Sequence, residues 1–324
     1  MRLPSKILSI AAAPLAAGCE GVQSALDPQG PAAAAIAQSA WIMGFGAAAI
    51  LALVMALALY AVYRAPGRRA PSSTAVIVAG GVALPVVALS ALLAYGVTLT
   101  RELRERGGEA ALELEVIGHR WWWEVRYPGA AAGETVASAN EIRIPAGRPV
   151  AIALSSADVI HSFWVPSLAG KIDAIPGRVN RIVLRAAQPG SFRGQCAEFC
   201  GAQHARMALE VRAETPEDFE RWLEGLRRPA RAAAAPGAGL FKTHCAQCHT
   251  VRGVAQSAGR LAAPDLTHVA SRPRLGGTLE NTPQNMAAWI ERNDALKPGN
   301  AMPAFRELDP RSLEALAAWL SSLE

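Results

Sequence analysis

The sequence predicts a multidomain protein: a hairpin of two transmembrane helices, then an all-β Greek-key domain, then an all-α domain. Three observations carry this prediction. Two long stretches near the N-terminus hold no charged residue. Short alternating or apolar runs, separated by Pro and Gly, fill residues 112–213, which is typical of a sandwich or barrel of short strands. After a linker rich in Ala, Pro and Gly, at residues 230–239, the pattern becomes helical.

The hairpin is expected at residues 41–63 and 74–98. Both stretches are uncharged, and each is long enough for the ~20 residues that a bilayer span needs. A pair of buried helices in a soluble protein is the alternative. The turn between them holds three arginines and no acidic residue, so the positive-inside rule places it in the cytoplasm and the rest of the chain, from Arg101 onward, outside.

An export signal is expected before the hairpin, at residues 1–18, where Arg2 and Lys6 precede a short apolar stretch. Leu15-Ala-Ala-Gly-Cys19 resembles the bacterial lipobox, which would make Cys19 the lipidated N-terminus. An ordinary signal peptide with a chance cysteine is the alternative. Residues 19–100 then comprise a loose external segment, up to about Ala37, and the hairpin.

The β domain is expected at residues 101–229. A helix with Thr215 as N-cap and Pro216 in its first turn would run to about Leu226 and close this domain. The all-α domain is expected at residues 240–324, with helix starts at Thr282-Pro283 and Asp309-Pro310. The clearest strand candidates are residues 112–116, 141–145, 150–154, 181–185 and 207–211.

The net charge of +5 does not indicate a nucleic-acid partner. Residues 1–100 carry five basic and two acidic groups, residues 101–235 carry eighteen and seventeen, and residues 236–324 carry nine and eight. Most of the excess therefore lies near the membrane segments. The folded domains are nearly neutral, so a nucleic-acid partner, which needs a basic face, loses its main support.

Residues 194–207 concentrate potential metal ligands. This stretch holds two cysteines, a glutamate, a histidine and a methionine, and His161 lies upstream. Such soft and borderline ligands suit copper and argue against magnesium or calcium. A disulfide between Cys196 and Cys200, or a zinc site, is the alternative, but zinc would leave Met207 and His161 without a role.

The pattern Cys196-x-Glu198-x-Cys200-x3-His204-x2-Met207, with His161 upstream, closely resembles the binuclear copper centre (CuA) of cytochrome c oxidase subunit II. The resemblance covers roughly residues 35–225, including the hairpin and the motifs at 118–124 and 171–178. It implies a cupredoxin-like fold with bridging Cys196 and Cys200 and one histidine on each copper. Met207 would be a weak axial ligand and the Glu198 carbonyl the last contact.

The resemblance assigns two further roles. It implies that the Glu198 carboxylate helps to bind magnesium at the interface with subunit I; a solvated surface glutamate is the alternative. It also implies that electrons enter at Trp121, although Trp122 stands where the family usually has tyrosine and Arg120 replaces a common glutamine. Strand alternation would place Trp121 and Trp123 on one face, and three packing tryptophans are the alternative.

A second cofactor motif is Cys245-Ala-Gln-Cys248-His249, a C-x-x-C-H sequence. It predicts haem c held by two thioether bonds, with His249 as the proximal ligand; zinc or a redox disulfide is the alternative. Met302, in an Asn-Ala-Met-Pro loop between two helices, resembles the usual methionine ligand loop of c-type cytochromes. Met286 falls within a helix and is expected in the core.

The chain thus resembles a bacterial cytochrome c oxidase subunit II with a fused cytochrome c domain, as in caa-type haem-copper oxidases. This resemblance implies a multi-pass protein of the inner membrane with both domains on the periplasmic face. Electrons would pass from soluble cytochrome c or an upstream respiratory complex to haem c, then to the copper pair. They would continue to haem a of subunit I, where oxygen is reduced to water and protons are pumped; this chain holds no oxygen site.

Four other classes of protein compete with this hypothesis. A stand-alone membrane-anchored haem/copper electron carrier and the CuA subunit of a nitric-oxide reductase remain alternatives. A nitrous-oxide reductase would need a larger catalytic domain, and a quinol-oxidase subunit would lack the copper ligands that are present here.

Overall fold

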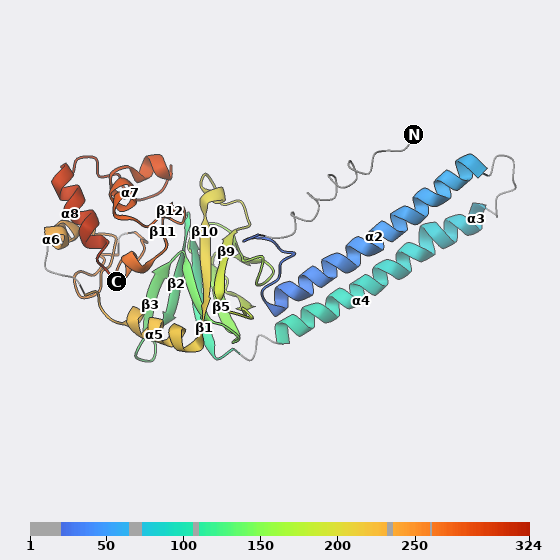
Figure 1. Cartoon of the computed structure of the whole chain (residues 1–324), viewed down its shortest axis with the longest axis horizontal. Coiled ribbons are helices and arrows are strands. Elements are labelled where there is room, and N and C mark those ends of the chain that lie inside the picture. Colours follow the sequence, from blue (N-terminus) through green and yellow to red (C-terminus); the bar gives the residue numbers. More distant parts are fainter. Residues whose placement is uncertain (1–20, 65–72, 106–109, 232–235, 260) are drawn as a thin grey trace, which may run out of the picture. The chain divides into compact units, whose positions relative to one another are not determined.

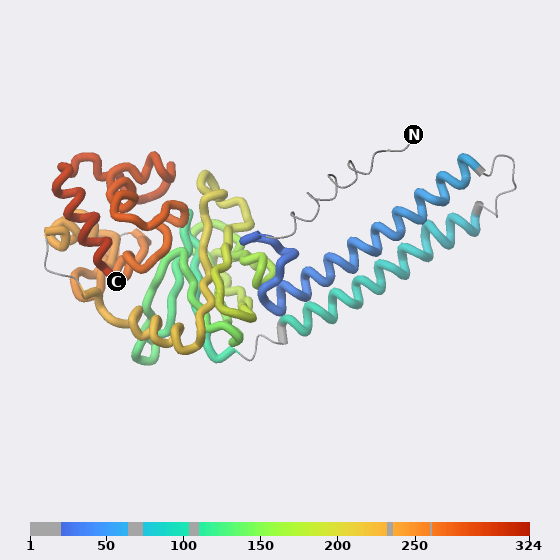
Figure 2. Tube along the Cα trace, viewed as in Figure 1, coloured from blue at the N-terminus to red at the C-terminus, as the bar shows by residue number. Residues whose placement is uncertain are grey.

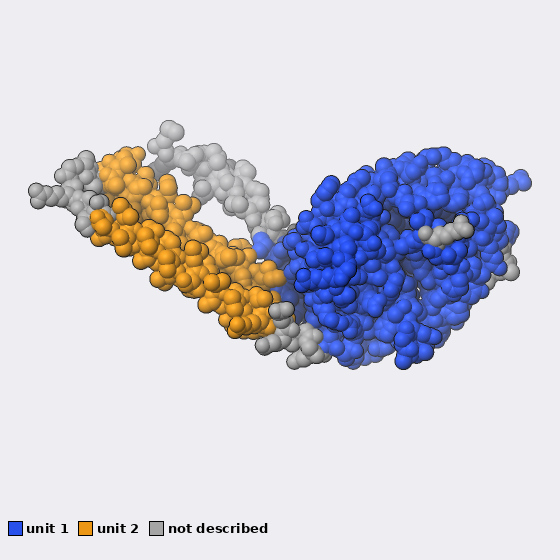
Figure 3. Space-filling model, turned by 180° about the vertical axis from the view of Figure 1, so that it is seen from behind, with its two compact units in different colours: residues 1–33, 110–324 blue, residues 34–109 orange. Residues whose placement is uncertain are grey.

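The computed structural model describes residues 21–64, 73–105, 110–231, 236–259 and 261–324. The chain divides into two compact units, residues 34–109 and residues 1–33 with 110–324 (Figure 3). The predicted export signal, Cys19 and most of the arginine-containing turn lie outside the described residues.

Two long apolar helical stretches form the hairpin (Figures 1 and 2). Residues Pro31–Tyr63 and Thr74–Leu103 are both long and apolar enough to cross a membrane, with a mean hydropathy of 2.5. A hydrogen bond of 3.4 Å from Ser39 Oγ to Tyr95 Oη joins them. The elements are α2 (Pro31–Arg64), α3 (Ser73–Val76), the π-helical η1 (Ile77–Ala83) and α4 (Leu84–Glu105).

Helix α2 corrects one expectation. Residues 31–37, which were expected in the loose external segment, form the first turns of this helix. The physical reason is local: Pro31 suits the first helical position, and five of the next six residues are alanine, the strongest helix former. Ala33 and Ala37 are buried, and the Ala33 N–H donates to the Leu168 carbonyl of the β domain.

The β domain is a sandwich of two five-stranded sheets, as expected. One sheet has the order β3-β2-β1-β5-β8 and the other β4-β10-β9-β6-β7; β1/β5 and β4/β10 are parallel, and the other pairs are antiparallel. The strands are β1 (Leu112–His119), β2 (Trp122–Pro128), β3 (Thr135–Ala139), β4 (Glu141–Pro145), β5 (Val150–Ser156), β6 (His161–Trp164), β7 (Ile172–Ala174), β8 (Asn180–Leu184), β9 (Gly190–Cys196) and β10 (Ala208–Glu214).

Alternating side chains of both sheets fill the space between them. Along β2, Trp123, Val125 and Tyr127 are buried while the residues between them are partly exposed. Helix α5 (Pro216–Arg227) covers one end with Phe219 and Leu223, and its N-cap is Thr215 as expected, with Oγ1 accepting from the Asp218 N–H. This rigid sandwich supports the loops that carry the metal-ligand motif.

The C-terminal domain is mainly helical. Phe241 of α6 packs against Trp319 of α8, with ring centroids 5.3 Å apart, and Met286 and Ile290 of α7 are buried in the same core. Thr282 and Asp309 cap α7 and α8 as expected. Helix α6 begins inside the predicted linker. The elements are α6 (Pro236–His244), η4 (Val269–Ser271), β11 (Arg274–Leu275), β12 (Leu279–Glu280), α7 (Pro283–Leu296) and α8 (Pro310–Leu320).

Candidate metal centre

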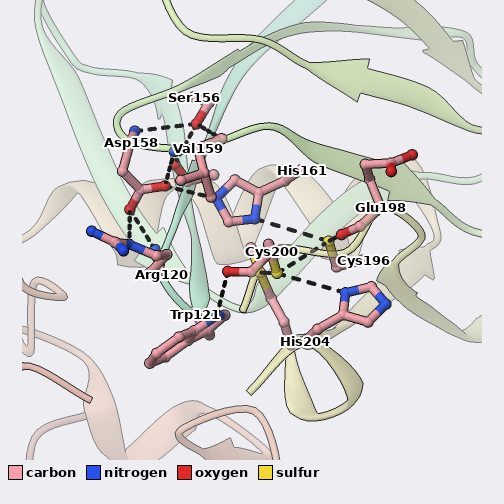
Figure 4. Close-up of polar contacts among 12 residues, drawn as sticks. Arg120, Trp121, Ser156, Asp158, Val159, His161, Cys196, Glu198, Cys200 and His204 are labelled. Atoms are coloured by element: carbon pink, nitrogen blue, oxygen red, sulfur yellow. Dashed lines mark hydrogen bonds and ion pairs between the residues drawn. The ribbon is translucent and has the colours of Figure 1, made fainter. Parts of the chain in front are cut away.

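The two cysteines of the metal-ligand motif lie side by side at one end of the sandwich (Figure 4). Cys196 ends β9 and Cys200 lies in the loop that follows it. Their Sγ atoms are 3.8 Å apart and both thiols are free. Because a disulfide needs about 2.0 Å, this arrangement is a dithiol pair.

The other predicted ligands surround this pair. Cys196 Sγ lies 3.9 Å from Nδ1 of His161 and 3.2 Å from the Glu198 carbonyl oxygen. Cys200 Sγ lies 3.6 Å from Nδ1 of His204 and 3.8 Å from Sδ of Met207. The structure therefore gathers all six predicted groups around two sulfur atoms. Two thiols, two imidazoles, a thioether and a carbonyl form a donor set that fits copper.

Backbone pairing fixes these groups in the absence of metal. Strand β6 pairs with β9 so that Phe163 lies opposite Cys196. The Cys196 N–H donates to the Met207 carbonyl at 2.9 Å, and the Ala197 N–H to the Ser162 carbonyl at 2.9 Å. The strand carrying His161, the strand ending at Cys196 and the segment carrying Met207 are thus joined by main-chain hydrogen bonds.

Gly118 of β1 makes room for the His161 ring. A Cβ placed on Gly118 would lie 2.8 Å from Cδ2 of His161, so any larger residue would displace the imidazole. Gly118 belongs to a motif that the sequence singled out, but its role depends on a strand pairing that the sequence alone does not reveal.

Asp158 orients the same histidine, and sequence reasoning gave it no role. Nε2 of His161 lies 2.8 Å from the Asp158 carboxylate, which also accepts from the backbone N–H groups of Val159 and Arg120. Burial alone would raise the pKa of Asp158, but these hydrogen bonds outweigh burial and lower it. The carboxylate therefore holds the proton on Nε2 and leaves Nδ1 free to face the thiols.

Burial and the neighbouring Cys196 raise the pKa of the Cys200 thiol to about 12. Without metal, this group keeps its proton at neutral pH. A metal ion that binds here must displace it, so loading releases protons.

The carbonyl of Glu198 lies in the metal-ligand cluster, and its carboxylate lies at the surface. In Figure 4 its carbonyl faces Cys196, whereas its carboxylate points away from the thiols. The side chain is exposed, and the neighbouring Phe199 is 78% exposed.

Trp121 lies directly against the thiol loop. It occupies the turn between β1 and β2, and its indole N–H donates to the Cys200 carbonyl at 2.9 Å. Trp123 lies in the core, and Trp122 stacks on His119 with centroids 4.4 Å apart. Because Trp121 precedes β2, the expected strand alternation does not apply to it.

The C-x-x-C-H motif follows α6 in the C-terminal domain. Cys245 and Cys248 are free and partly buried. Nδ1 of His249 lies 2.8 Å from the Pro264 carbonyl, which fixes the proton on Nδ1, while burial lowers the pKa of the ring. The neutral Nε2 is then available to a metal. This arrangement fits a haem c proximal histidine.

The two methionines differ as expected. Met302 is partly buried in the loop between α7 and α8, where its N–H donates to Oδ1 of Asn300 at 2.9 Å. Met286 is 3% exposed and belongs to the apolar core. Only Met302 therefore remains a candidate ligand of the two.

Comparisons with known proteins match both domains. Residues 130–214 match the family model "Cytochrome C oxidase subunit II, periplasmic domain", and residues 234–324 match "Cytochrome c". Cytochrome c oxidase subunit 2 of Alkalihalophilus pseudofirmus is 34% identical over 332 residues, covering 95% of this chain and 93% of the relative. The Bacillus subtilis protein of the same name is 30% identical over 262 residues, covering 74% and 72%.

Among solved structures, the periplasmic domain of subunit II of cytochrome oxidase from Bradyrhizobium japonicum is 32% identical. The match covers 36% of this chain and 94% of that chain, with a TM-score of 0.34.

Proposed function

Because the chain belongs to the cytochrome c oxidase subunit II family, we propose that it carries electrons from an attached haem c, through a binuclear copper centre, to haem a of subunit I. The family makes it a subunit of a haem-copper oxidase, and the two matched domains imply copper and haem c. The observation that carries the proposal is the gathering of two imidazoles, a thioether and a backbone carbonyl around two thiols whose sulfur atoms are 3.8 Å apart.

The copper ligands we propose are His161, Cys196, Cys200, His204, Met207 and the Glu198 carbonyl. When bound, copper would supply one-electron transfer, and Cys196 and Cys200 would hold it through their two thiolates. The chain supplies the rigidity that this chemistry needs, because paired strands hold the ligands in place beforehand.

The haem c ligands we propose are Cys245 and Cys248 as thioether anchors and His249 and Met302 on the iron. Methionine ligation would raise the haem potential. Trp121, bonded to the Cys200 carbonyl, is the proposed point at which electrons reach the copper loop.

The exposed Glu198 carboxylate and Phe199 support an interface with subunit I, where the carboxylate would help to bind magnesium. The two apolar helices support a multi-pass anchor with both folded domains on the outer face. Oxygen reduction and proton pumping belong to other subunits. Soluble cytochrome c or an upstream respiratory complex would supply the electrons.

Purification from native membrane tests this proposal. The chain should co-purify with a haem-a-containing subunit, bind two copper ions and one haem c, and consume oxygen with reduced cytochrome c. Recovery of the chain without a haem-a partner would favour a stand-alone carrier instead. The Cys196→Ser variant should lose the near-infrared absorption of the copper pair while haem c is still incorporated.

A further inference from the structure

Lys297 is a buried lysine outside both proposed cofactor sites. It follows α7 and is 3% exposed. Its Nζ donates to the Trp121 carbonyl at 2.7 Å and to the Gly276 carbonyl at 2.7 Å. Trp121 belongs to the β domain and Gly276 to the C-terminal domain, so one ammonium group joins the two. Burying a charged group is costly unless it is hydrogen-bonded, and the two carbonyls supply that compensation here.

The residues beside Lys297 contact the metal-site region too. The side chain of Gln203 donates to the Pro298 carbonyl, and Arg206 to the Leu296 carbonyl, each at 2.8 Å. Gly299 has φ +81°, and a Cβ on it would lie 3.5 Å from Cη2 of Trp121. The segment 296–299 therefore lies against Trp121 and the loop that follows Cys200.

This segment leads directly to Met302. Asn300 donates to the Asn293 and Lys297 carbonyls and accepts from the Met302 N–H, so the loop is internally braced. Trp121 in turn donates to the Cys200 carbonyl. A continuous series of bonds and contacts thus runs from the candidate iron ligand to a candidate copper ligand.

A separate set of contacts joins the C-terminal domain to the end of α5 and to the residue that follows it. Arg252 donates to the Leu226 and Arg227 carbonyls at the end of α5, and His268 Nε2 lies 3.0 Å from the Arg228 carbonyl. These contacts keep the domain attached to the β domain without involving Trp121. Loss of the Lys297 hydrogen bonds would therefore leave this second attachment in place.

We propose that Lys297 is a positioning residue that clamps the Met302 loop onto Trp121, so that the attached haem domain, and no soluble donor, delivers electrons there. This inference rests on the proposed function. With both cofactors bound, ferrous haem c held by the C-terminal domain would supply one electron, and oxidised copper held by the thiol loop would accept it. Lys297 keeps its protons and takes no part in the redox chemistry. A soluble donor must then reduce haem c first.

The test compares the intact oxidase complex with its Lys297→Met variant, which keeps the side-chain length and removes the donors. After photoreduction of haem c, electron transfer to copper should slow by at least about tenfold, since small misplacements of reacting groups are costly. The haem and copper spectra and midpoint potentials should stay unchanged. Amide hydrogen exchange in the peptide covering residues 296–300 should accelerate. Lys242→Met, an exposed lysine of α6, is the control and should change none of these.

Two results would overturn the inference. One is a folded Lys297→Met complex with the wild-type transfer rate; the other is a slower rate accompanied by a shifted haem potential, which would make Lys297 a support of the haem fold. If Lys297→Met does not fold, Arg206→Ala decides: it removes the neighbouring contact to Leu296, and an unchanged rate and unchanged exchange overturn the clamp. Failure of the proposed function is separate, because it would appear in the wild type as missing copper absorption or a missing haem-a partner.

Discussion

The carboxylate of Asp158 shows how a single residue prepares the candidate copper site. It binds Nε2 of His161 and two backbone N–H groups. Outer partners of this kind fix the tautomer and the direction of a metal-ligating histidine.

Asp158→Asn should weaken copper binding by roughly 10–100-fold, the usual effect of losing such a partner. Competition of the full chain with a copper chelator measures this change. Glu113→Gln, which removes a carboxylate exposed on β1, should leave copper affinity unchanged. Equal affinities for Asp158→Asn and wild type would show that the hydrogen bond does not orient the ligand.

Met302→Leu should abolish methionine ligation and lower the haem potential, because a thioether ligand raises it. A redox titration of haem c measures the shift. The matched variant Met286→Leu changes a core residue of similar volume, at a cost below about 1.5 kcal/mol, and should leave the potential unchanged. If only Met286→Leu lowers the potential, the axial assignment is wrong.

Sequence reasoning found the residues whose chemistry is visible in their type and spacing. The cysteines, histidines and methionine of the metal motif qualify, and the structure gathers them. The roles of Asp158 and Lys297 were not predicted, because they depend on hydrogen-bond partners that only the fold brings close. The one available signal was an aspartate three residues before His161.

Among the strands too, some are predictable from the sequence pattern and others are not. Strands β1, β4, β5, β8 and β10 were predicted from alternating or apolar runs, and all five are present. Strand β6 lacks such a pattern, because its residues His161 to Phe163 are all buried and show no alternation. Strand β7 has only three residues, too few for a pattern.

Gly118→Ala tests whether strand β1 supports the site. The added methyl group would crowd the His161 ring, and overpacking of this kind costs about 1–3 kcal/mol. The thermal midpoint of the β domain, followed by tryptophan fluorescence, should fall, and the near-infrared copper band should shift. Gly225→Ala in α5, where a Cβ meets nothing within 4 Å, should be neutral or stabilising. If the thermal midpoint falls equally in both variants, the close approach of Gly118 to His161 is not what makes Gly118→Ala destabilising.

At the scale of the whole molecule, the β domain and the C-terminal domain belong to one compact unit. The sequence predicted two domains and a linker but not their contacts. The contacts include side chains that donate to backbone carbonyls, such as Lys297 to Trp121 and Gln203 to Pro298. A backbone carbonyl carries no sequence signature, so such an interface cannot be read from residue types.

This interface should respond to pH through Lys297. Burial, aided by Arg206 and opposed by Cys200, lowers the pKa of Lys297 from 10.5 to about 8. If the contact opens, the pKa of Lys297 returns to its ordinary value of 10.5. Between these two values the open state binds more protons than the closed state, so the closed state gains stability as pH rises through this window. Below pH 8 both states are protonated and the contact is at its weakest.

Hydrogen exchange of the peptide covering residues 296–300 measures this dependence, after correction for the intrinsic effect of pH on amide exchange. Protection in the wild type should rise on the order of tenfold between about pH 7.5 and about pH 9.5, as the two pKa values require. Lys297→Met has no titrating group and should show no such rise. Wild-type protection that falls or stays constant would mean that the lysine is not buried at a domain contact in solution. A rise shared by both proteins would assign the pH dependence to another group.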